Sequence, residues 1–194
     1  MKKGTYLTEI YRSPKSVLTT KDISLMWHEP ATGDLRVRLN YYVKTGKLRH
    51  LRRGLYVKDE NYNKMELASR VFTPSYVSFE TILSREGLVF QYHENITVAS
   101  YLSRETIIDG QVYNFRKVKN SVLLNNNGII QDGVFSVASK ERALLDTLYS
   151  NTNYHFDNLR DINWQIIDNL LPIYSNKRLN KVVARLKKEQ NDEI

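Results

Sequence analysis

Two short β-like runs around one tight turn restrict the fold of this chain more than any other feature. Residues 48–51 and 55–58 flank the tripeptide Arg52-Arg53-Gly54. Gly54 can take the positive φ that a tight hairpin turn needs, because glycine has no Cβ to clash with the backbone. These residues therefore predict a β-hairpin with two arginines at its tip.

Hydrophobic spacing before the hairpin predicts three helices. The first covers residues 5–11, with its apolar side chains on one side. The second follows Thr20, which we expect as its N-cap. The third covers residues 34–45, and Gly46 is expected to cap its C-terminal end. Helix, helix, turn, helix and basic hairpin is the order of elements in a winged helix-turn-helix.

Positive charge is concentrated in the same region. The chain of 194 residues has a formal net charge of +8. Residues 1–60 contain 13 Lys and Arg against 6 Asp and Glu, whereas residues 61–194 contain 16 against 15. Most of the excess lies in residues 34–58, where Asp34 is the single acidic residue. Such a distribution is expected of a nucleic-acid-binding module, and a solvated basic face is the alternative explanation of the charge alone.

The third predicted helix and the hairpin supply the candidate DNA contacts. In the major groove, Asn40 is suited to bond adenine bidentately, and Arg36, or Arg38 on the flank of the helix face, to bond guanine. On the same helix face as Val37, Tyr41 would stack on sugar or a thymine methyl group, or else pack against the hairpin. The other basic side chains would neutralise phosphates or enter a minor groove: Lys44, Lys47, Arg49, Arg52 and Arg53.

The rest of the chain predicts a second, mixed α+β domain that ends in two helices. With a polar connector as the boundary, residues 1–62 form the winged helix-turn-helix domain and residues 63–194 the α+β domain. The expected strands are residues 96–100, 105–109 and 111–118, and one more within 125–139. Residues 76–89 are expected to form a short extended entry and a helix that Gly87 closes, and the other expected helices are residues 65–72, 140–149, 159–171 and 176–190. The last helix has six basic residues. They could contact DNA, an acidic protein surface or only water, and the sequence leaves these three alternatives open.

Three segments give the chain a resemblance to a known family. They are GKLRHLRRGLYVK at 46–58, SYVSFETILSREGLV at 75–89 and FSVASKERALLDTLY at 135–149. In content, order and spacing they resemble the AbiEi-type antitoxins of type IV toxin–antitoxin systems, which are transcriptional regulators of phage defence by abortive infection.

The resemblance implies a function for each domain. The first domain would bind inverted repeats in the promoter of its own operon as a repressor, and an inverted repeat would accommodate a homodimer. Arg49, Arg52 and Arg53 match the basic wing of the family. The second domain would counter a nucleotidyltransferase-like toxin.

No sequence pattern indicates catalysis. His28-Glu29 and His93-Glu94 begin like a zinc-protease helix motif, but each lacks the second histidine four residues after the first. The glycines form neither a dinucleotide fingerprint nor a phosphate loop nor a nucleophile elbow. Cysteine is absent, which excludes disulfides and thiolate metal sites. We therefore expect no enzyme, no catalytic residue, no metal site and no cofactor.

Two other interpretations remain open from the sequence. One is a stand-alone winged-helix transcription factor without a toxin. The other is a protein-interaction module that inhibits a partner enzyme and uses its winged helix for dimerisation or RNA binding. No stretch approaches the roughly 20 apolar residues of a membrane span, so we expect a cytoplasmic protein with no membrane partner.

Overall fold

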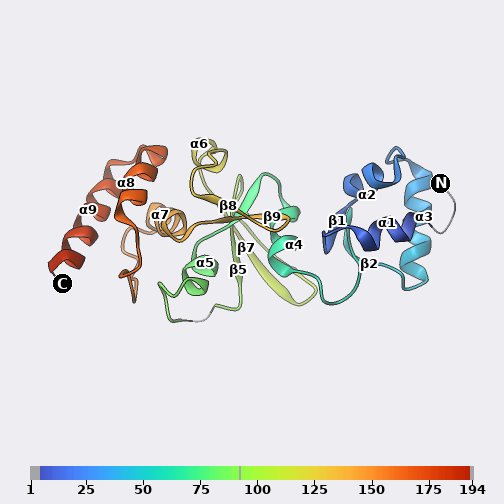
Figure 1. Ribbon diagram of the computed structural model, residues 1–194, viewed down its shortest axis with the longest axis horizontal. Coiled ribbons are helices and arrows are strands. Elements are labelled where there is room, and N and C mark those ends of the chain that lie inside the picture. Colours follow the sequence, from blue (N-terminus) through green and yellow to red (C-terminus); the bar gives the residue numbers. More distant parts are fainter. Residues whose placement is uncertain (1–4, 92, 193–194) are drawn as a thin grey trace. The chain divides into compact units, whose positions relative to one another are not determined.

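The computed structural model describes residues 5–91 and 93–192, and it divides into two compact units, Met1–Val71 and Phe72–Ile194 (Figure 1). Each unit combines helices with a β-sheet, so the predicted α+β class is confirmed. Across the described ranges, every helix is too short or too polar to cross a membrane.

The first unit combines a three-stranded antiparallel sheet with helices. The strand order is β1-β3-β2. The elements are α1 (Thr5–Arg12), β1 (Val17–Thr19), α2 (Thr20–Trp27), α3 (Gly33–Lys44), β2 (Arg49–Arg52), β3 (Leu55–Val57) and α4 (Lys64–Val71). The three predicted helices and the predicted hairpin are present. Strand β1 was not expected, because three residues are too few to display an alternating pattern before they pair with β3.

Thr19 caps α2, and the prediction of Thr20 as the cap was wrong. Thr19 Oγ1 accepts a hydrogen bond from Asp22 N at 3.0 Å, and the Asp22 carboxylate accepts one from Thr19 N at 2.9 Å. This reciprocal pair is a capping box. Thr20 N instead donates to the Gly54 carbonyl at 3.0 Å, which ties the start of α2 to the hairpin turn.

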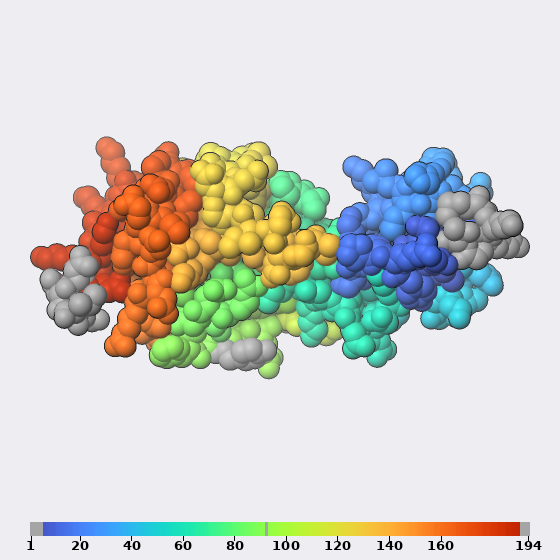
Figure 2. Space-filling model, viewed as in Figure 1, coloured from blue at the N-terminus to red at the C-terminus, as the bar shows by residue number. Residues whose placement is uncertain are grey.

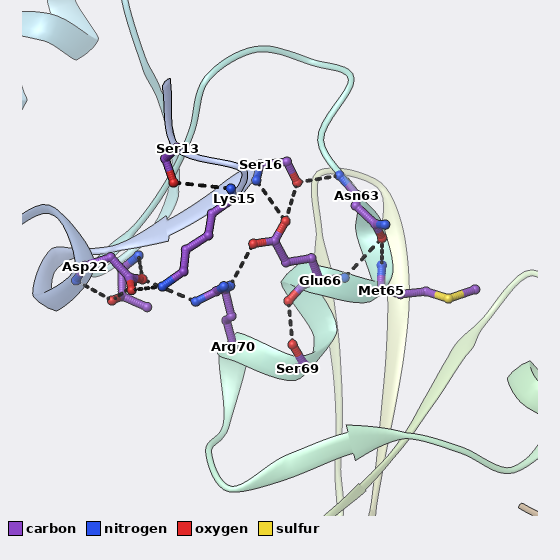
Figure 3. Close-up of polar contacts among 10 residues, drawn as sticks. Ser13, Lys15, Ser16, Asp22, Asn63, Met65, Glu66, Ser69 and Arg70 are labelled. Atoms are coloured by element: carbon purple, nitrogen blue, oxygen red, sulfur yellow. Dashed lines mark hydrogen bonds and ion pairs between the residues drawn. The ribbon is translucent and has the colours of Figure 1, made fainter. Parts of the chain in front are cut away.

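Helix α4 belongs to the first unit, although the predicted boundary after residue 62 assigns it to the second. Glu66 of α4 is 1% exposed and accepts hydrogen bonds from Ser16 N at 2.9 Å and Ser16 Oγ at 2.6 Å (Figure 3). Arg70 of the same helix bonds Glu66 at 3.0 Å and Asp22 at 3.2 Å. The compact unit therefore extends to Val71, because buried charge fixes α4 to the segment before α2.

The second unit is built on a six-stranded mixed sheet with the order β6-β7-β5-β4-β9-β8. Its elements are β4 (Ser75–Val77), α5 (Glu80–Arg85), β5 (Ile96–Ser100), β6 (Arg104–Ile108), β7 (Gln111–Lys117), α6 (Asn120–Leu123), β8 (Ile129–Asp132), β9 (Phe135–Ala138), α7 (Lys140–Ser150), α8 (Trp164–Leu170), the 3₁₀ turn η1 (Leu171–Tyr174) and α9 (Lys177–Asp192). The single strand expected within 125–139 is a hairpin of two strands, because Gly133 turns the chain with φ of 65°.

Helix α7 lies between the sheet and the two C-terminal helices (Figure 1). Its residues 141–148 are all buried. Helix α8 is shorter than the predicted 159–171, because the Asn163 side chain caps it by accepting hydrogen bonds from Gln165 N and Ile166 N. The 3₁₀ turn that contains Pro172 ends it, as the sequence predicted.

Candidate nucleic-acid interface

Helix α3 is held in the first unit by one apolar face. Leu35 and Leu39 are fully buried and Tyr42 is nearly so. They join a core that includes Trp27 and Ile10. The 3.6-residue period of the helix leaves the opposite face in solvent. The sequence thus fixes which side of α3 is available to a partner.

The outward face of α3 combines charge, amide and apolar groups. Five exposed residues make up this face, which we call the α3 outer face: Arg36, Val37, Asn40, Tyr41 and Lys44. Val37 is 69% exposed and Tyr41 is 61% exposed. Tyr41 also contacts the ring of Tyr42, with centroids 5.6 Å apart. Such a face offers hydrogen-bond donors and acceptors beside apolar contact groups, which is what reading of base edges requires.

Arg38 does not belong to the α3 outer face. Its guanidinium forms an ion pair with Glu29 at 2.6 Å and lies 4.0 Å above the ring of Tyr6. The Tyr6 hydroxyl also donates to Glu29, and this bond, with Arg38 beside it, holds the pKa of Glu29 below its usual value. The sequence offered Arg36 and Arg38 as alternative guanine contacts, but the structure commits Arg38 to interactions within its own unit.

The β2-β3 hairpin presents the second group of candidate residues. Gly54 has a φ of 78°, as the predicted turn requires. Arg53 is exposed at the turn, whereas Arg49 and Arg52 are half-buried. Lys47 is exposed in the connection from α3.

Backbone contacts fix the hairpin against α3. The amides of Lys47 and Leu48 both donate to the Tyr42 carbonyl, at 2.8 and 3.2 Å. Burial raises the pKa of Tyr56 in β3, and the positive charge of Arg36 on α3 opposes that shift. Six of the nine predicted residues are thus exposed on α3, on the hairpin or in the connection between them: Arg36, Asn40, Tyr41, Lys44, Lys47 and Arg53. The other three, Arg38, Arg49 and Arg52, are half-buried.

Val37 is absent from the nine residues predicted to contact DNA. Its position on the α3 outer face was visible in the helical period, since it lies one residue after Arg36 and three before Asn40. Charge and hydrogen-bonding groups indicate base and phosphate contacts, but they give no signal for an apolar contact residue such as Val37.

The second unit contains a buried charged network on α7. Arg142 and Asp146 of α7 are both 0% exposed. Asp146 accepts hydrogen bonds from the hydroxyls of Tyr174 at 2.7 Å, Ser78 at 2.8 Å and Tyr76 at 3.0 Å. Burial raises the pKa of Asp146, while Arg142 and the hydroxyl donors oppose that shift.

This network joins two of the three segments that carry the family resemblance. Tyr76 and Ser78 lie in residues 75–89, and Arg142 and Asp146 lie in residues 135–149. Arg142 also donates to the Val122 carbonyl at 2.7 Å. Because water cannot reach these groups, they stabilise the unit rather than meet a substrate. Among the residues that the structure describes, no three His, Cys, Asp or Glu side chains are grouped to hold a metal ion.

Comparison with solved structures gives a distant likeness. No protein-family model matches the sequence, and no curated protein matches it. Among solved structures, the crystal structure of the RV2827C protein from Mycobacterium tuberculosis is similar, with 13% sequence identity and a TM-score of 0.49. The match covers 93% of this chain and 71% of that chain. At this identity and TM-score, the likeness assigns neither a family nor a function.

Proposed function

We propose that the first unit is a winged helix-turn-helix that binds duplex DNA, with α3 in the major groove and the β2-β3 hairpin as the wing. The observation that carries this proposal is the α3 outer face, an exposed set of residues on a helix whose other side is buried. Asn40 is the residue suited to bond adenine, and Arg36 the one suited to bond guanine. Val37 and Tyr41 offer apolar contact to thymine methyl groups.

Phosphate contacts would come from the cations around these residues. Lys44, Lys47 and Arg53 are exposed, and Arg49 and Arg52 lie half-buried in the hairpin beside them. Backbone contacts of this kind set position and orientation, whereas base contacts set specificity. Arg38 is left out of the proposal because its ion pair with Glu29 supports the unit itself.

The resemblance to AbiEi-type antitoxins supports a more specific proposal about the role of the chain in the cell. On that basis, the chain represses its own operon as a homodimer on inverted repeats, and it is the antitoxin of a nucleotidyltransferase-like toxin. The support is the order and spacing of residues 46–58, 75–89 and 135–149. A nucleotidyltransferase-like reading frame beside the gene would favour an antitoxin over a stand-alone transcription factor.

DNA binding is tested with the full chain and the DNA upstream of its gene, by gel shift over a salt series. If the first unit neutralises about four to six phosphates, it contributes a slope of about −4 to −5 in log K against log salt per protomer. Asn40→Ala should cost about 1–3 kcal/mol on the upstream duplex and much less on a random duplex.

Asn61→Ala is the matched control, since Asn61 is also exposed in the first unit but lies outside α3 and the hairpin. It should leave both affinities unchanged. Binding that ignores salt, or an equal loss on both duplexes for Asn40→Ala, would remove the proposed reading of bases by α3.

A further inference from the structure

Helix α9 carries a one-sided row of positive charge. Five exposed residues form it, which we call the α9 basic row: Lys177, Arg178, Lys181, Arg185 and Lys188. At about 100° per residue they fall within an arc of about 100°, and at about 1.5 Å per residue they extend over about 16 Å of the helix axis. The red C-terminal segment that includes α9 lies on the surface of the second unit (Figure 2).

The rest of α9 is fixed in place, so the row is presented by a rigid support. Leu179 and Val183 are buried on the opposite side of the helix. Gln190 bonds Trp164 Nε1 at 2.6 Å and the Leu159 carbonyl at 2.7 Å. The sixth cation of the helix, Lys187, lies off the row and forms an ion pair with Asp168 at 2.7 Å.

An ordinary solvated helix face does not account for the row. Such faces usually mix charges of both signs. Among the described side chains, the row instead has one acidic ion-pair partner, Glu189, whose carboxylate lies 3.6 Å from Arg185. Lys177, Lys181 and Arg185 follow at intervals of four residues, and each like-charge pair at this interval destabilises a helix by about 0.2–0.5 kcal/mol. A bound polyanion would relieve that repulsion.

The surroundings of the row are acidic, so the row is not part of a generally basic surface. Residues 72–176 contain 8 Lys and Arg against 11 Asp and Glu. The described side chains of α9 also include no exposed large apolar residue. A protein interface would need an apolar centre, and a membrane surface would need apolar anchors.

We infer that the α9 basic row binds the phosphate backbone of duplex DNA and is a second DNA contact, separate from the first unit. Five charges over about 16 Å of the α9 axis resemble in density the one phosphate per about 3.4 Å of duplex axis that each DNA strand carries. With no amide, aromatic or apolar group in the row, the contact is independent of sequence. The choice of duplex DNA as the polyanion rests on the function proposed above.

The test compares three full-length proteins by salt-dependent gel shift on the upstream duplex and on a random duplex. The row variant is Lys177→Gln, Lys181→Gln and Lys188→Gln. The control, Arg104→Gln, Lys117→Gln and Lys119→Gln, removes the same charge from exposed positions of the second unit outside α9. The row variant should make the slope of log K against log salt shallower by about 2–3, with equal fold losses on both duplexes, whereas the control should keep the original slope. Circular dichroism verifies folding, which exposed Gln residues should preserve.

A slope that the row variant leaves unchanged, or that the control changes equally, would overturn the inference. An unchanged slope would favour an acidic protein surface, and not DNA, as the partner of the α9 basic row. A fourth protein, Lys44→Gln with Lys47→Gln and Arg53→Gln, separates this inference from the proposed function. If the slope becomes shallower only in the fourth protein, the first unit binds DNA and the α9 basic row does not. If it becomes shallower only in the row variant, the α9 basic row binds DNA and the proposed function of the first unit is wrong.

Discussion

The candidate DNA surface of the first unit and the α7 network of the second unit treat charged side chains in opposite ways. The first unit has an apolar core that includes Ile10, Leu18 and Trp27, and it presents its cations on α3 and the hairpin. The second unit buries Arg142 and Asp146 completely inside a shell of hydroxyl donors. Burial of a charge is costly unless it is paired and hydrogen-bonded. The difference teaches that an arginine-rich motif indicates a binding surface only when its charges remain in water.

Removal of one partner of the buried pair Arg142 and Asp146 has the largest expected effect on stability and tests this contrast. Asp146→Ala should lower the stability of the second unit by about 3–5 kcal/mol, because it leaves Arg142 buried without its carboxylate. Hydrogen exchange of α7 amides measures the loss. Asp168→Ala removes the partner of an exposed ion pair and should cost less than about 1 kcal/mol. Similar small losses for the two variants would mean that the buried network adds little to stability.

Two arginines on α3 sharpen the contrast within the first unit. Arg38→Ala should destabilise this unit by about 1 kcal/mol through the lost contact with the Tyr6 ring alone. Arg36→Ala should change stability by less than about 0.5 kcal/mol and weaken binding to the upstream duplex about tenfold or more. Hydrogen exchange and gel shift on both variants measure these effects. The reverse pattern would place Arg38 at the interface and Arg36 in a structural role.

Val37 gives the smallest effect and tests whether α3 reads thymine. Its side chain is exposed in the centre of the α3 outer face. Val37→Ala removes two methyl groups and should weaken binding to the upstream duplex about two- to fourfold if one of them is buried on a thymine, at about 0.8 kcal/mol per buried group. A duplex of the same sequence made with uracil lacks the thymine methyl groups, and on it the two proteins should bind alike. A Val37→Ala loss that persists on uracil DNA would show that no methyl contact is involved.

Local patterns predicted much of the first unit and of the candidate surface. Gly54 indicated the hairpin turn, and the helical period indicated which side of α3 is exposed. The helical period placed Arg38 on the flank of this face, but it could not show that Arg38 pairs with Glu29. The partners of Arg38 lie on α1 and just after α2, and no spacing rule connects them to α3.

Pairing between distant segments was also beyond the sequence. The unit boundary was wrong because the bond between Ser16 and Glu66 spans 50 residues. The role of Asp146 was hidden for the same reason, since its donors Ser78 and Tyr174 come from distant segments.

The sequence by itself determined the α+β class, the position of the basic hairpin and the periodic faces of α3 and α9. These features depend on residues within one or two turns of each other, where backbone geometry sets the outcome. Only the tertiary structure decided which charges remain in water. That choice depends on the desolvation of each group and on partners from other segments. Arg142 and Arg53 are the same amino acid in charged motifs, and folding buries one and exposes the other.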